Sequence, residues 1–575
     1  MVTSMKNKHV AEILYEIADL LDIKGDIFFK TRAYRIAAQK IETLDEDIEI
    51  IVEEKRIKTI PGIGEAIAKK IKEIVQTGKL EYLEKLKKEI PGELLNFLDI
   101  PGVGPKKISA IYKKLNITKI DELKKACKQG KLRDLEGFGE LTERNILRGI
   151  KLKEKTSGRA LLNLAYDNGN SYINYLEKFD HVNRISIAGS LRRMKETIGD
   201  IDILVSSDKP EKIMDYFTKY PKIQRVLLKG KTKTSVLLKD NLQVDLRVVK
   251  DESYGSALQY FTGSKEHNVK MRSISLKKGY KLNEYGLFNK KTEKYIVGKK
   301  EEDIYKKLGM KFIDPELREN RGEIQASIKN KLPTLVKLKD IKGDFHVHSN
   351  YSDGSEKIKD LVEYAKKLGY LYIAISDHSQ SLKIAQGLSE EKVNKKIKEI
   401  EKINKKNPEI KILCGTECDI KADGTLDYPD KILKKFDIVG IGIHTKFKMT
   451  QKEATNRIIK GFENKYVNFL AHPTCRLIGR REPFELDMEK IFDKARETNT
   501  YMEINSFPDR LDLNDFYIKI AKEKKIGFVI GTDAHMLDHM NFMKYGISTA
   551  RRGWLEKKDI LNTYPYDKLE KKLEK

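Results

Sequence analysis

Two aspartates stand two positions apart in an apolar run of this chain. The stretch "AGSLRRMKETIGDIDILV" (188–205) contains Asp200 and Asp202, which share one face if the run is a β-strand. Asp245, in "LQVDLRVV", is a third acid among apolar residues, where an unpaired charge is costly. Three carboxylates can hold two Mg²⁺ ions about 4 Å apart, the arrangement that phosphoryl transfer to a 3′-hydroxyl requires.

Residues that suit a phosphate precede this acidic pair. Gly189 and Ser190 offer a backbone amide and a hydroxyl, and Arg192 and Arg193 add positive charge. A lone Asp-x-Asp is often only a solvated strand end. This chain has a more specific pattern than Asp-x-Asp alone, because Gly-Ser and Arg-Arg precede the pair and a third acid follows it. We therefore expect a phosphoryl-transfer site here.

A second cluster of candidate metal ligands lies after residue 340, where six of the ten histidines stand in short motifs. Each motif follows an apolar run, and strand ends converge on one mouth in an α/β barrel. A ligand set of imidazoles and carboxylates without thiolates suits Zn²⁺, Mn²⁺ or Fe²⁺. Coordination positions of the metal that the protein leaves open could carry the water needed for hydrolysis. One histidine alone could equally be a hydrogen-bonded core residue, but recurrence at successive strand ends favours a site for up to three ions. The nine candidates are His346, His348, Asp353, His378, Glu417, His444, His472, Asp533 and His535.

A Pro-Gly-x-Gly device is repeated in the first part of the chain. It appears in "IPGIGEAIAKKI" (60–71) and "IPGVGPKKISAI" (100–111), with a weaker copy in "LEGFGELTERNIL" (135–147). Glycines allow a tight turn that leaves the amides of the next helix open to a phosphate, although a simple helix-to-helix turn uses them too. The pattern resembles helix-hairpin-helix motifs, which hold the DNA backbone without reading sequence. The DNA-binding candidates are Gly62, Gly64, Gly102 and Gly104.

Composition agrees with a polyanionic partner. The 575 residues include 113 Lys and Arg against 87 Asp and Glu, a net charge of +26, which favours nucleic acid over a merely lysine-rich composition. The four cysteines form no CxxC pair, so neither a disulfide framework nor a thiolate zinc site is expected. No apolar stretch approaches the roughly 20 residues of a membrane span. We therefore expect a cytoplasmic protein without a membrane partner.

The pattern of apolar residues changes twice along the chain. Helical spacing, as in "HVAEILYEIADLLDI", continues to about residue 150, and short β-rich runs such as "RISIAG" begin near 183. A charged connector follows residue 315. After 340, apolar strands alternate with charged helices, which predicts βα units around a parallel sheet or barrel.

Three segments, "GSLRR…GDIDIL", "VDLRVV" and "YFTGSKEHNVKMR", resemble the palm and nucleotide pocket of family X DNA polymerases, the DNA polymerase beta kin. The resemblance covers roughly residues 1–320 and implies that Asp200, Asp202 and Asp245 bind Mg²⁺ or Mn²⁺. It places Gly189, Ser190 and Arg193 at the triphosphate of the incoming dNTP. Tyr260, Phe261 and Gly263 would line the sugar, and Asn268 and Arg272 would face the base and template. Lys265 departs from the acid of vertebrate relatives, which bears on nucleotide affinity and fidelity.

The same resemblance extends to "FFKTRAYRIAAQKI" and the first hairpin, whose family counterparts form a lyase domain acting on an abasic-site sugar. Such a lyase needs a lysine of lowered pKa that forms a Schiff base. Lys70 matches that nucleophile, with Lys30 and Tyr34 as phosphate-binding and orienting groups. The alternative is that Lys70 matches the lyase nucleophile by chance, because the chain contains many lysines.

The histidine motifs, "HVHSNYSD…SDHS…TE…GIH…AHPT…GTDAH", resemble the PHP (polymerase and histidinol phosphatase) domain, a distorted (βα)7 barrel that hydrolyses phosphoesters. In a chain that also carries a polymerase, the resemblance implies a 3′-5′ exonuclease and abasic-site endonuclease with Mn²⁺ or Zn²⁺. Arg480 and Arg481, in "LIGRREPF", are expected either to grip the substrate phosphate or to be surface charge. Two alternatives stay open: a small-molecule phosphatase, and a scaffold that metals only stabilise.

The predicted fold is multidomain, with helical helix-hairpin-helix domains, an α/β nucleotidyltransferase palm with a thumb, and a C-terminal (βα)7 PHP barrel. The predicted function is gap filling in DNA repair by a monomer acting on gapped or nicked DNA and dNTPs. The expected domains are a lyase-like domain at 1–85, a second helix-hairpin-helix domain at 86–153, the palm at 154–255, the thumb at 256–318, a linker at 319–340 and the PHP domain at 341–575.

Overall fold

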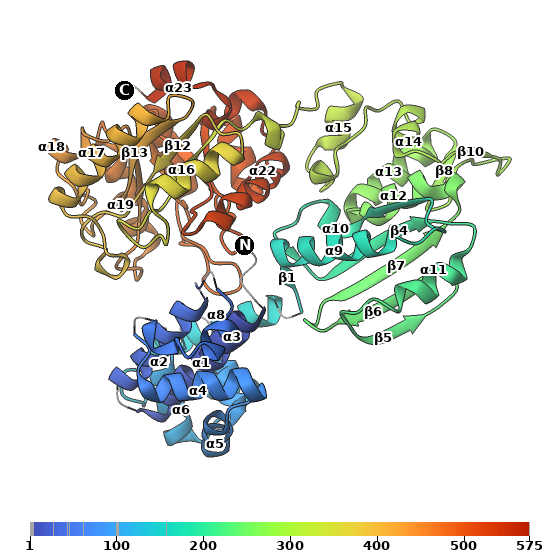
Figure 1. Ribbon diagram of the computed structural model, residues 1–575. Helices are drawn as coiled ribbons and strands as arrows, with labels where there is room; N and C mark the ends of the chain where they lie inside the picture. The colour runs from blue at the N-terminus through green and yellow to red at the C-terminus, as the bar shows by residue number, and fades with distance from the viewer. Residues whose placement is uncertain are drawn as a thin grey trace. The chain divides into compact units, whose positions relative to one another are not determined.

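The computed structural model of the protein describes residues 5–26, 28–42, 44, 46–60, 62–98, 100, 103–156 and 158–573. The chain forms two compact units (Figure 1). One contains residues 1–157 and 479–482, and the other contains residues 158–478 and 483–575. Within the described ranges, no helix is both long enough and apolar enough to cross a membrane.

The first unit is helical, as the apolar spacing predicts. In α1 the side chains of Leu14, Ile17 and Leu21 are fully buried, so the predicted apolar face of this helix is confirmed. One buried cluster contains residues from α1 to α8 and therefore includes helices on both sides of the expected boundary at 85/86. The domain limits stay a prediction. The elements are α1 (Met5–Lys24), α2 (Phe28–Glu42), α3 (Ile48–Glu53), η1 (Ile57–Thr59), α4 (Glu65–Thr77), α5 (Glu81–Glu89), η2 (Gly92–Phe97), α6 (Pro105–Leu115), α7 (Ile120–Lys128) and α8 (Glu140–Thr156).

The second unit begins with a five-stranded sheet, the predicted palm. Its strand order is β2-β4-β7-β6-β5, and β4 and β7 are parallel while the other neighbours are antiparallel. The strands are β2 (Arg184–Ile187), β4 (Asp200–Ser206), β5 (Ile223–Lys229), β6 (Lys233–Leu238) and β7 (Gln243–Val249), with a separate pair β1 (Ala160–Leu161) and β3 (Thr197–Ile198). The helices are α9 (Leu162–Leu176), α10 (Gly189–Arg192), α11 (Pro210–Phe217) and α12 (Tyr254–Thr262).

Side chains along β4 alternate between the two faces of the sheet, and this alternation decides which face carries Asp200 and Asp202. Ile201 and Ile203 are buried with residues of α9 and α11, whereas Leu204 is buried on the other face with Ala257 of α12. Because side chains two apart share a face, Asp200 and Asp202 lie on the same face as Leu204. The apolar residues of the strand thus fix the face that carries the carboxylates.

A small thumb and a connector follow the palm. The segment expected as a linker, 319–340, includes α15, where Glu323 bonds the buried His267 of α13 at 2.7 Å (Oε1 to Nδ1). Ile324 is also buried with residues of the thumb, so this segment is folded rather than extended. The elements are η3 (Asp251–Ser253), α13 (Lys265–Lys277), β8 (Tyr280–Asn283), β9 (Gly286–Asn289), β10 (Tyr295–Val297), α14 (Glu301–Lys307), η4 (Pro315–Leu317), α15 (Glu323–Ile328) and η5 (Leu338–Asp340).

Seven parallel strands in sequence order form a nearly closed barrel, so the predicted (βα)7 class is confirmed. A parallel bridge between Val347 and Ala534 joins the first strand to the segment after the last, and helices surround the strands (Figure 1). The strands are β11 (Gly343–Val347), β12 (Tyr372–Ile375), β13 (Lys411–Asp419), β14 (Ile438–Gly442), β15 (Phe469–Leu470), β16 (Tyr501–Asn505) and β17 (Phe528–Gly531). The helices are α16 (Ile358–Lys367), η6 (Lys383–Ala385), α17 (Glu390–Lys406), α18 (Asp430–Leu433), α19 (Gln451–Phe462), α20 (Met488–Glu497), α21 (Asp515–Glu523), η7 (Leu537–Phe542), α22 (Met543–Arg552), η8 (Lys557–Asp559), η9 (Leu561–Thr563) and α23 (Tyr566–Leu573).

The palm and the barrel share apolar packing. Leu511 and Tyr545 belong to the barrel sequence but are buried in the same cluster as the palm strands. The ring of Tyr545 meets that of Tyr166 in α9 edge to face, with centroids 6.1 Å apart. The palm core is therefore completed by side chains from more than 250 residues further along the chain.

A buried ion pair stabilises the barrel between α17 and the strands. Lys396 Nζ lies 2.8 Å from Asp377 Oδ2, and both side chains are fully buried. The same ammonium donates to the carbonyl oxygens of Ile375 and Gly415, at 2.8 and 3.0 Å. Its loss would leave a buried carboxylate without its counter-charge.

We therefore expect Lys396→Ala to lower the free energy of unfolding of the barrel by about 3–5 kcal/mol. Urea unfolding can be followed by the fluorescence of Trp554, the single tryptophan of the chain, which lies where α21 of the barrel meets the thumb. Lys395→Ala is the matched control, because this exposed neighbour pairs with Glu391 one turn away, and it should cost at most about 0.5 kcal/mol. Equal losses in the two variants would contradict the assignment.

Candidate active sites

The structure brings the three predicted carboxylates of the palm together. β4 and β7 are paired in register, with Asp202 opposite Asp245. One oxygen from each of Asp200, Asp202 and Asp245 lies within 4.8 Å of the other two. Oxygen ligands at this spacing fit Mg²⁺ or Mn²⁺.

The electrostatics of this cluster also fit a cation. Burial, followed by the charges of Asp200 and Asp245, raises the pKa of Asp202 to about 7. Burial acts in the same direction on Asp245, but hydrogen bonds from Lys233 and Gln243 outweigh it and lower the pKa of that carboxyl. Lys233 Nζ lies 2.6 Å from Asp245 Oδ2. A cation between the three groups would relieve the repulsion that keeps Asp202 partly protonated.

The turn that precedes the acids depends on a glycine. Gly189 has φ +62°, and a Cβ at this position would lie 2.1 Å from Asp202 Oδ2. Ser190 is half-buried beside it in α10. Of the two arginines, Arg192 is engaged by the thumb, since its Nη2 bonds Glu301 Oε2 at 2.6 Å. Arg193 bonds Glu319 Oε1 through Nε at 3.0 Å.

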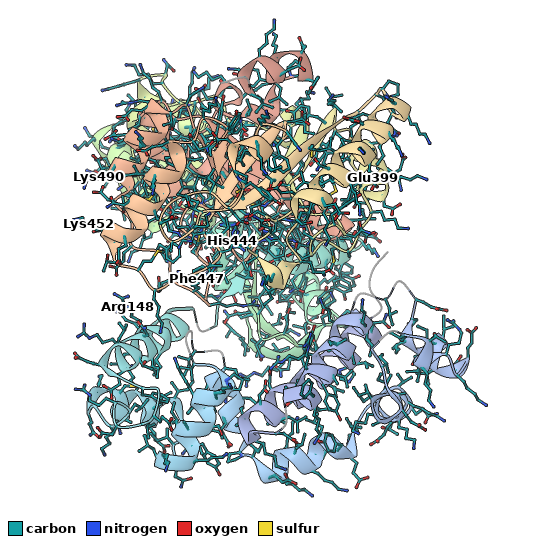
Figure 2. The ribbon with its side chains drawn as sticks, turned by 90° about the vertical axis from the view of Figure 1, so that its left-hand side faces the viewer. Arg148, Glu399, His444, Phe447, Lys452 and Lys490 are labelled. Carbon is teal, nitrogen blue, oxygen red and sulfur yellow. The ribbon has the colours of Figure 1, made fainter. Side chains whose placement is uncertain are left out.

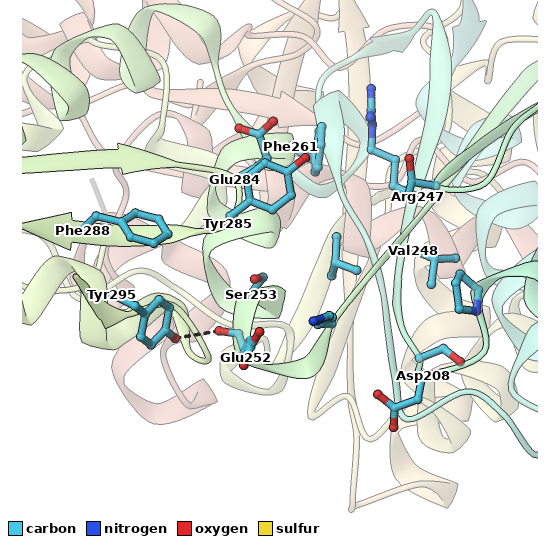
Figure 3. A pocket seen from close by; sticks show the side chains of 15 residues that line it. Asp208, Arg247, Val248, Glu252, Ser253, Phe261, Glu284, Tyr285, Phe288 and Tyr295 are labelled. Carbon is cyan, nitrogen blue, oxygen red and sulfur yellow. Dashed lines mark hydrogen bonds between the residues drawn. The ribbon is translucent and has the colours of Figure 1, made fainter. Parts of the chain in front are cut away.

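Of the three residues expected at the sugar, Phe261 lines a cavity between palm and thumb, and Tyr260 and Gly263 do not. Phe261 meets Tyr260 edge to face at 5.1 Å, and the guanidinium of Arg247 lies 4.3 Å from the Phe261 ring centre. The cavity holds about 830 Å³, and Figure 3 shows Phe261 beside Arg247, with Tyr285 nearby. Arg247 follows Asp245 by two residues in β7, but Asp200, Asp202 and Asp245 are not among the residues that line this cavity.

The residues expected at the base have unequal surroundings. Asn268 is buried; its Nδ2 donates to the carbonyl of Tyr260 at 2.7 Å and its Oδ1 accepts from Gln259. Asn268 thus fixes the backbone of the sugar-side segment. Arg272 and Lys265 are exposed on α13. Gly263 has φ +71°, in the left-handed region that favours glycine.

Lys70, Lys30 and Tyr34, the three residues expected in a lyase, lie around Tyr82, which the sequence did not single out. The ammonium of Lys70 lies 4.7 Å from the ring centre of Tyr82, and that of Lys30 lies 5.9 Å from the same centre. Tyr34 stacks on Tyr82, with ring centroids 6.4 Å apart. Burial and then the charge of Lys30 lower the pKa of Lys70, which is the direction that Schiff-base chemistry needs.

The hairpin glycines begin the helices that the repeat predicts. Gly62 has φ +89°, and a Cβ there would lie 2.8 Å from Ile36. Gly64 and Gly104 immediately precede α4 and α6, so the first turns of these helices follow them. Gly102 lies outside the described residues. Gly137 of the weaker third copy also has a positive φ, of +78°.

All nine predicted ligands of the barrel lie at one end of its strands. Figure 2 shows His444 at the same end as Phe447, in the loop after β14, while Lys452 and Lys490 lie on the outer helices. Three groups of ligand atoms lie close enough to share an ion. They are His348, Asp353, His378 and His535; His346, His348 and Asp533; and His378, Glu417 and His444. His472 joins them, with Nε2 2.6 Å from Glu417 Oε1.

The spacing of these donor atoms fits bound cations. Nε2 of His346 and Nε2 of His348 are 3.1 Å apart, and Nε2 of His444 and Nε2 of His472 are 3.3 Å apart. Ligands about 2.1 Å from one ion lie about 3.0–3.4 Å from each other. Among the described residues, the buried Nδ1 of His348 makes no hydrogen bond. Mixed imidazole and carboxylate donors suit Mn²⁺ or Zn²⁺.

Acids behind the ligands orient the imidazoles. Glu503 Oε1 lies 2.7 Å from His346 Nδ1, and its Oε2 accepts from the backbone amide of His472 at 2.6 Å. Asp419 Oδ1 lies 3.3 Å from His444 Nδ1. Such partners turn the other ring nitrogen toward the centre of the site and increase its basicity.

The imidazoles differ in charge state. Burial lowers the pKa of His444, but Glu417 and Asp419 outweigh it and raise this pKa to about 9. Burial, together with the charges of His535 and His378, lowers the pKa of His348 to about 4. A metal ion bound by these imidazoles would compete with their protons.

Arg510 also reaches this cluster, although the sequence motifs do not include it. Its Nε lies 3.3 Å from Asp533 Oδ2, and its side chain is 22% exposed. Its buried Nη1 makes no hydrogen bond within the described chain. Arg480 and Arg481 belong to the segment 479–482 of the other compact unit, and their expected grip on the phosphate stays a prediction.

Sequence reasoning missed three acids that support the ligands, Glu503, Asp419 and Asp344. Each lies in an apolar strand: "TYMEINS", "GTECDI" and "GDFHVHS". Asp344 is fully buried and accepts from the Thr532 hydroxyl at 2.5 Å. The cost of burying an unpaired acid, which identified Asp245, could have identified these three as well.

Family models match most of the chain in five segments. A helix-hairpin-helix domain matches 5–80, and a SAM-like helix-hairpin-helix tandem matches 94–152. The DNA polymerase beta palm matches 168–277 and the DNA polymerase beta thumb matches 257–319. The PHP domain matches 344–507.

Curated relatives match either the whole chain or one of its parts. DNA polymerase/3′-5′ exonuclease PolX of Bacillus subtilis is 38% identical over 563 residues, 97% of each chain. DNA polymerase lambda of Rattus norvegicus is 26% identical over 345 residues, 54% of this chain and 56% of its own length. A probable phosphatase of Thermoanaerobacter is 30% identical over 164 residues, 27% of this chain and 64% of its own. The chain therefore belongs to the family X DNA polymerases that carry a C-terminal PHP domain.

Proposed function

We propose that the protein fills short gaps in DNA during repair and that its barrel removes nucleotides from 3′ ends and cleaves at abasic sites. The observation that carries the proposal is that one chain brings together two clusters of candidate ligands, three carboxylates in the palm and nine residues in the barrel. The Bacillus subtilis relative, whose name contains both activities, supports it. The substrates would be gapped or nicked DNA and dNTPs.

In the palm, Asp200, Asp202 and Asp245 would hold two Mg²⁺ or Mn²⁺ ions. Such ions, when bound, supply the charge that activates a 3′-hydroxyl and stabilises a leaving pyrophosphate. Gly189 and Ser190 would bind the triphosphate together with Arg193. Phe261, held between Tyr260 and Arg247, would present a flat ring to the sugar and exclude a 2′-hydroxyl by shape.

In the barrel, the nine ligands would hold up to three Mn²⁺ or Zn²⁺ ions. These ions, when bound, activate water and stabilise charge on a phosphoester. Glu503 and Asp419 keep His346 and His444 oriented toward the centre. The buried donor of Arg510 would bind a phosphate oxygen of the substrate.

Two other roles for the barrel make different predictions. A small-molecule phosphatase would act without a DNA end, and a scaffold would lose stability but no activity when a ligand is removed. The PolX relative matches the chain over 97% of its length and carries both segments, which favours a nuclease acting on DNA. The experiment below distinguishes the three.

Separate substitutions should separate the two activities. With a labelled primer on gapped DNA and Mn²⁺, Asp200→Ala should lower extension by about 10³-fold or more, since several kcal/mol of charge stabilisation is lost. His346→Ala should abolish shortening of the primer without dNTPs. Each variant should keep the other activity.

Matched substitutions outside the sites provide the controls. Asp240→Ala removes an exposed acid of the palm that bonds Asn168, and His181→Ala removes a palm histidine that contacts Phe179. Both variants should extend and shorten primers at the wild-type rate. If His346→Ala shortens the primer as fast as wild type, the nuclease proposal fails.

We also propose an abasic-site lyase in the first unit, with Lys70 as nucleophile. Borohydride should trap the protein on incised abasic DNA, and Lys70→Ala should remove most of the trapped product, because the Schiff base forms on this amine. Lys69→Ala, which removes the neighbouring exposed lysine paired with Glu65, is the control. Equal trapping by Lys70→Ala and wild type would refute the assignment.

Substituting Arg510 should weaken the nuclease without emptying its metal site. We expect Arg510→Gln to lower the exonuclease kcat/KM about ten- to hundredfold, the contribution of a charge-assisted hydrogen bond, with bound Mn²⁺ or Zn²⁺ unchanged by metal analysis. Arg480→Gln tests the sequence-based expectation in parallel. A loss only in Arg480→Gln would transfer the phosphate-binding role to that residue.

A further inference from the structure

Arg193, the arginine proposed to bind the triphosphate, is held at the edge of the palm by several groups. Its Nε lies 3.0 Å from Glu319 Oε1, and its Nη1 donates to the carbonyl of Thr262. The same Nη1 lies 3.1 Å from the position of a Cβ on Gly263, so the guanidinium rests against that turn. The side chain is 13% exposed.

The barrel contributes directly to this arrangement through the last residue of α22. Arg552 Nη1 donates to the backbone carbonyl of Arg193 at 2.8 Å and to Glu319 Oε1 at 3.1 Å. Arg552 Nη2 bonds Asp515 Oδ2 at 2.5 Å, and Asp515 also bonds Arg321. The side chain of Arg552 is 5% exposed, and it is held by Glu319 and the Arg193 carbonyl on one side and by Asp515 on the other.

One carboxylate balances several cations at this point. Glu319 lies 3.0 Å from Arg193, 3.1 Å from Arg552 and 4.0 Å from Lys195. Burial raises the pKa of Glu319, but the charges of Arg552 and Arg193 outweigh it and keep the pKa low. Without Arg552, the charge of Glu319 would act mainly on Arg193, and the carbonyl of Arg193 would lose its donor.

We propose that Arg552 of the PHP barrel is a positioning residue of the polymerase site. It holds the backbone of Arg193 and shares Glu319 with it, so that the guanidinium stays oriented and available to a triphosphate. The barrel thereby sets the affinity of the palm for its nucleotide. This inference rests on the proposed role of Arg193 in nucleotide binding.

The neighbouring arginine of α22 offers a built-in comparison. Arg551 Nε bonds Glu316 at 2.7 Å, and its Nη1 donates to the carbonyl of Val336, so it too joins the barrel to the connector. None of its described contacts involves Arg193 or Glu319. A general effect of domain contact would affect both arginines, whereas positioning of Arg193 requires only Arg552.

The test measures single-nucleotide gap filling by the full-length protein with saturating DNA and varied dNTP. We expect Arg552→Gln to raise the KM for dNTP about tenfold, the contribution of one hydrogen bond to a charged group, with kcat and exonuclease activity unchanged. Arg552→Lys, which keeps the charge but not the fork of donors, should give a smaller rise. Arg551→Gln should leave KM at the wild-type value.

A double variant shows whether Arg552 acts through Arg193. Arg193→Gln should raise the KM by itself, and adding Arg552→Gln should raise it no further, because the positioned group is already gone. If Arg193→Gln has the wild-type KM, the proposed role of Arg193 fails. If Arg193→Gln raises the KM but both Arg552 variants do not, or if Arg551→Gln raises it equally, the positioning role alone is overturned.

Glu319→Gln provides the answer if the buried Arg552 variants do not fold. It removes the shared charge and keeps the shape of the side chain, and normal exonuclease activity reports an intact barrel. A raised KM with normal exonuclease activity supports the positioning role. An unchanged KM overturns it.

Discussion

Both sites crowd ionisable groups together, and in the palm the surrounding structure compensates for the repulsion between carboxylates of one charge. Two carboxylates about 4 Å apart repel by roughly 4 kcal/mol at an effective dielectric constant of 20. In the palm, the parallel pairing of β4 and β7 enforces the contact between Asp202 and Asp245, and Lys233 offsets part of it. In the barrel, Glu417 and Asp533 lie among six imidazoles, and Glu503 and Asp419 hold the rings from behind. Each cluster is stable only because secondary structure positions its backbone first.

The same logic extends to the contact between palm and barrel. Glu319 lies between cations from the palm and from α22, and Asp515 lies between Arg552 and Arg321. These groups are mostly buried, so solvent and salt screen them little. A change of charge on one side therefore affects the other side strongly. The nucleotide pocket and the nuclease barrel are thus linked by electrostatics as well as by the chain.

The sequence predicted the elements and most ligands because both leave local patterns. The two-residue spacing of Asp200 and Asp202 and the histidines after apolar runs can be recognised without coordinates. The helical first unit and the βα units after residue 340 follow from periodicity, whereas the (βα)7 barrel followed from the resemblance to the PHP domain. The supporting groups were missed because their partners are distant in sequence: Glu503 is 157 residues from His346. Arg510 belongs to no sequence motif. Its proposed role in phosphate binding depends on the conformation of the loop after β16, which the sequence does not reveal. The segment 319–340, expected to be a linker, is folded because Glu323 reaches the buried His267.

The burial of Leu511 and Tyr545 among the palm residues bears on how this protein can be divided. Family boundaries suggest modules that could be separated by a cut near residue 330, but such a cut would expose the apolar surface that these two side chains cover. An isolated polymerase half would then tend to associate through that patch. A polymerase half without the barrel would need polar substitutions on this face of the palm, whereas the intact chain covers the face with Leu511 and Tyr545.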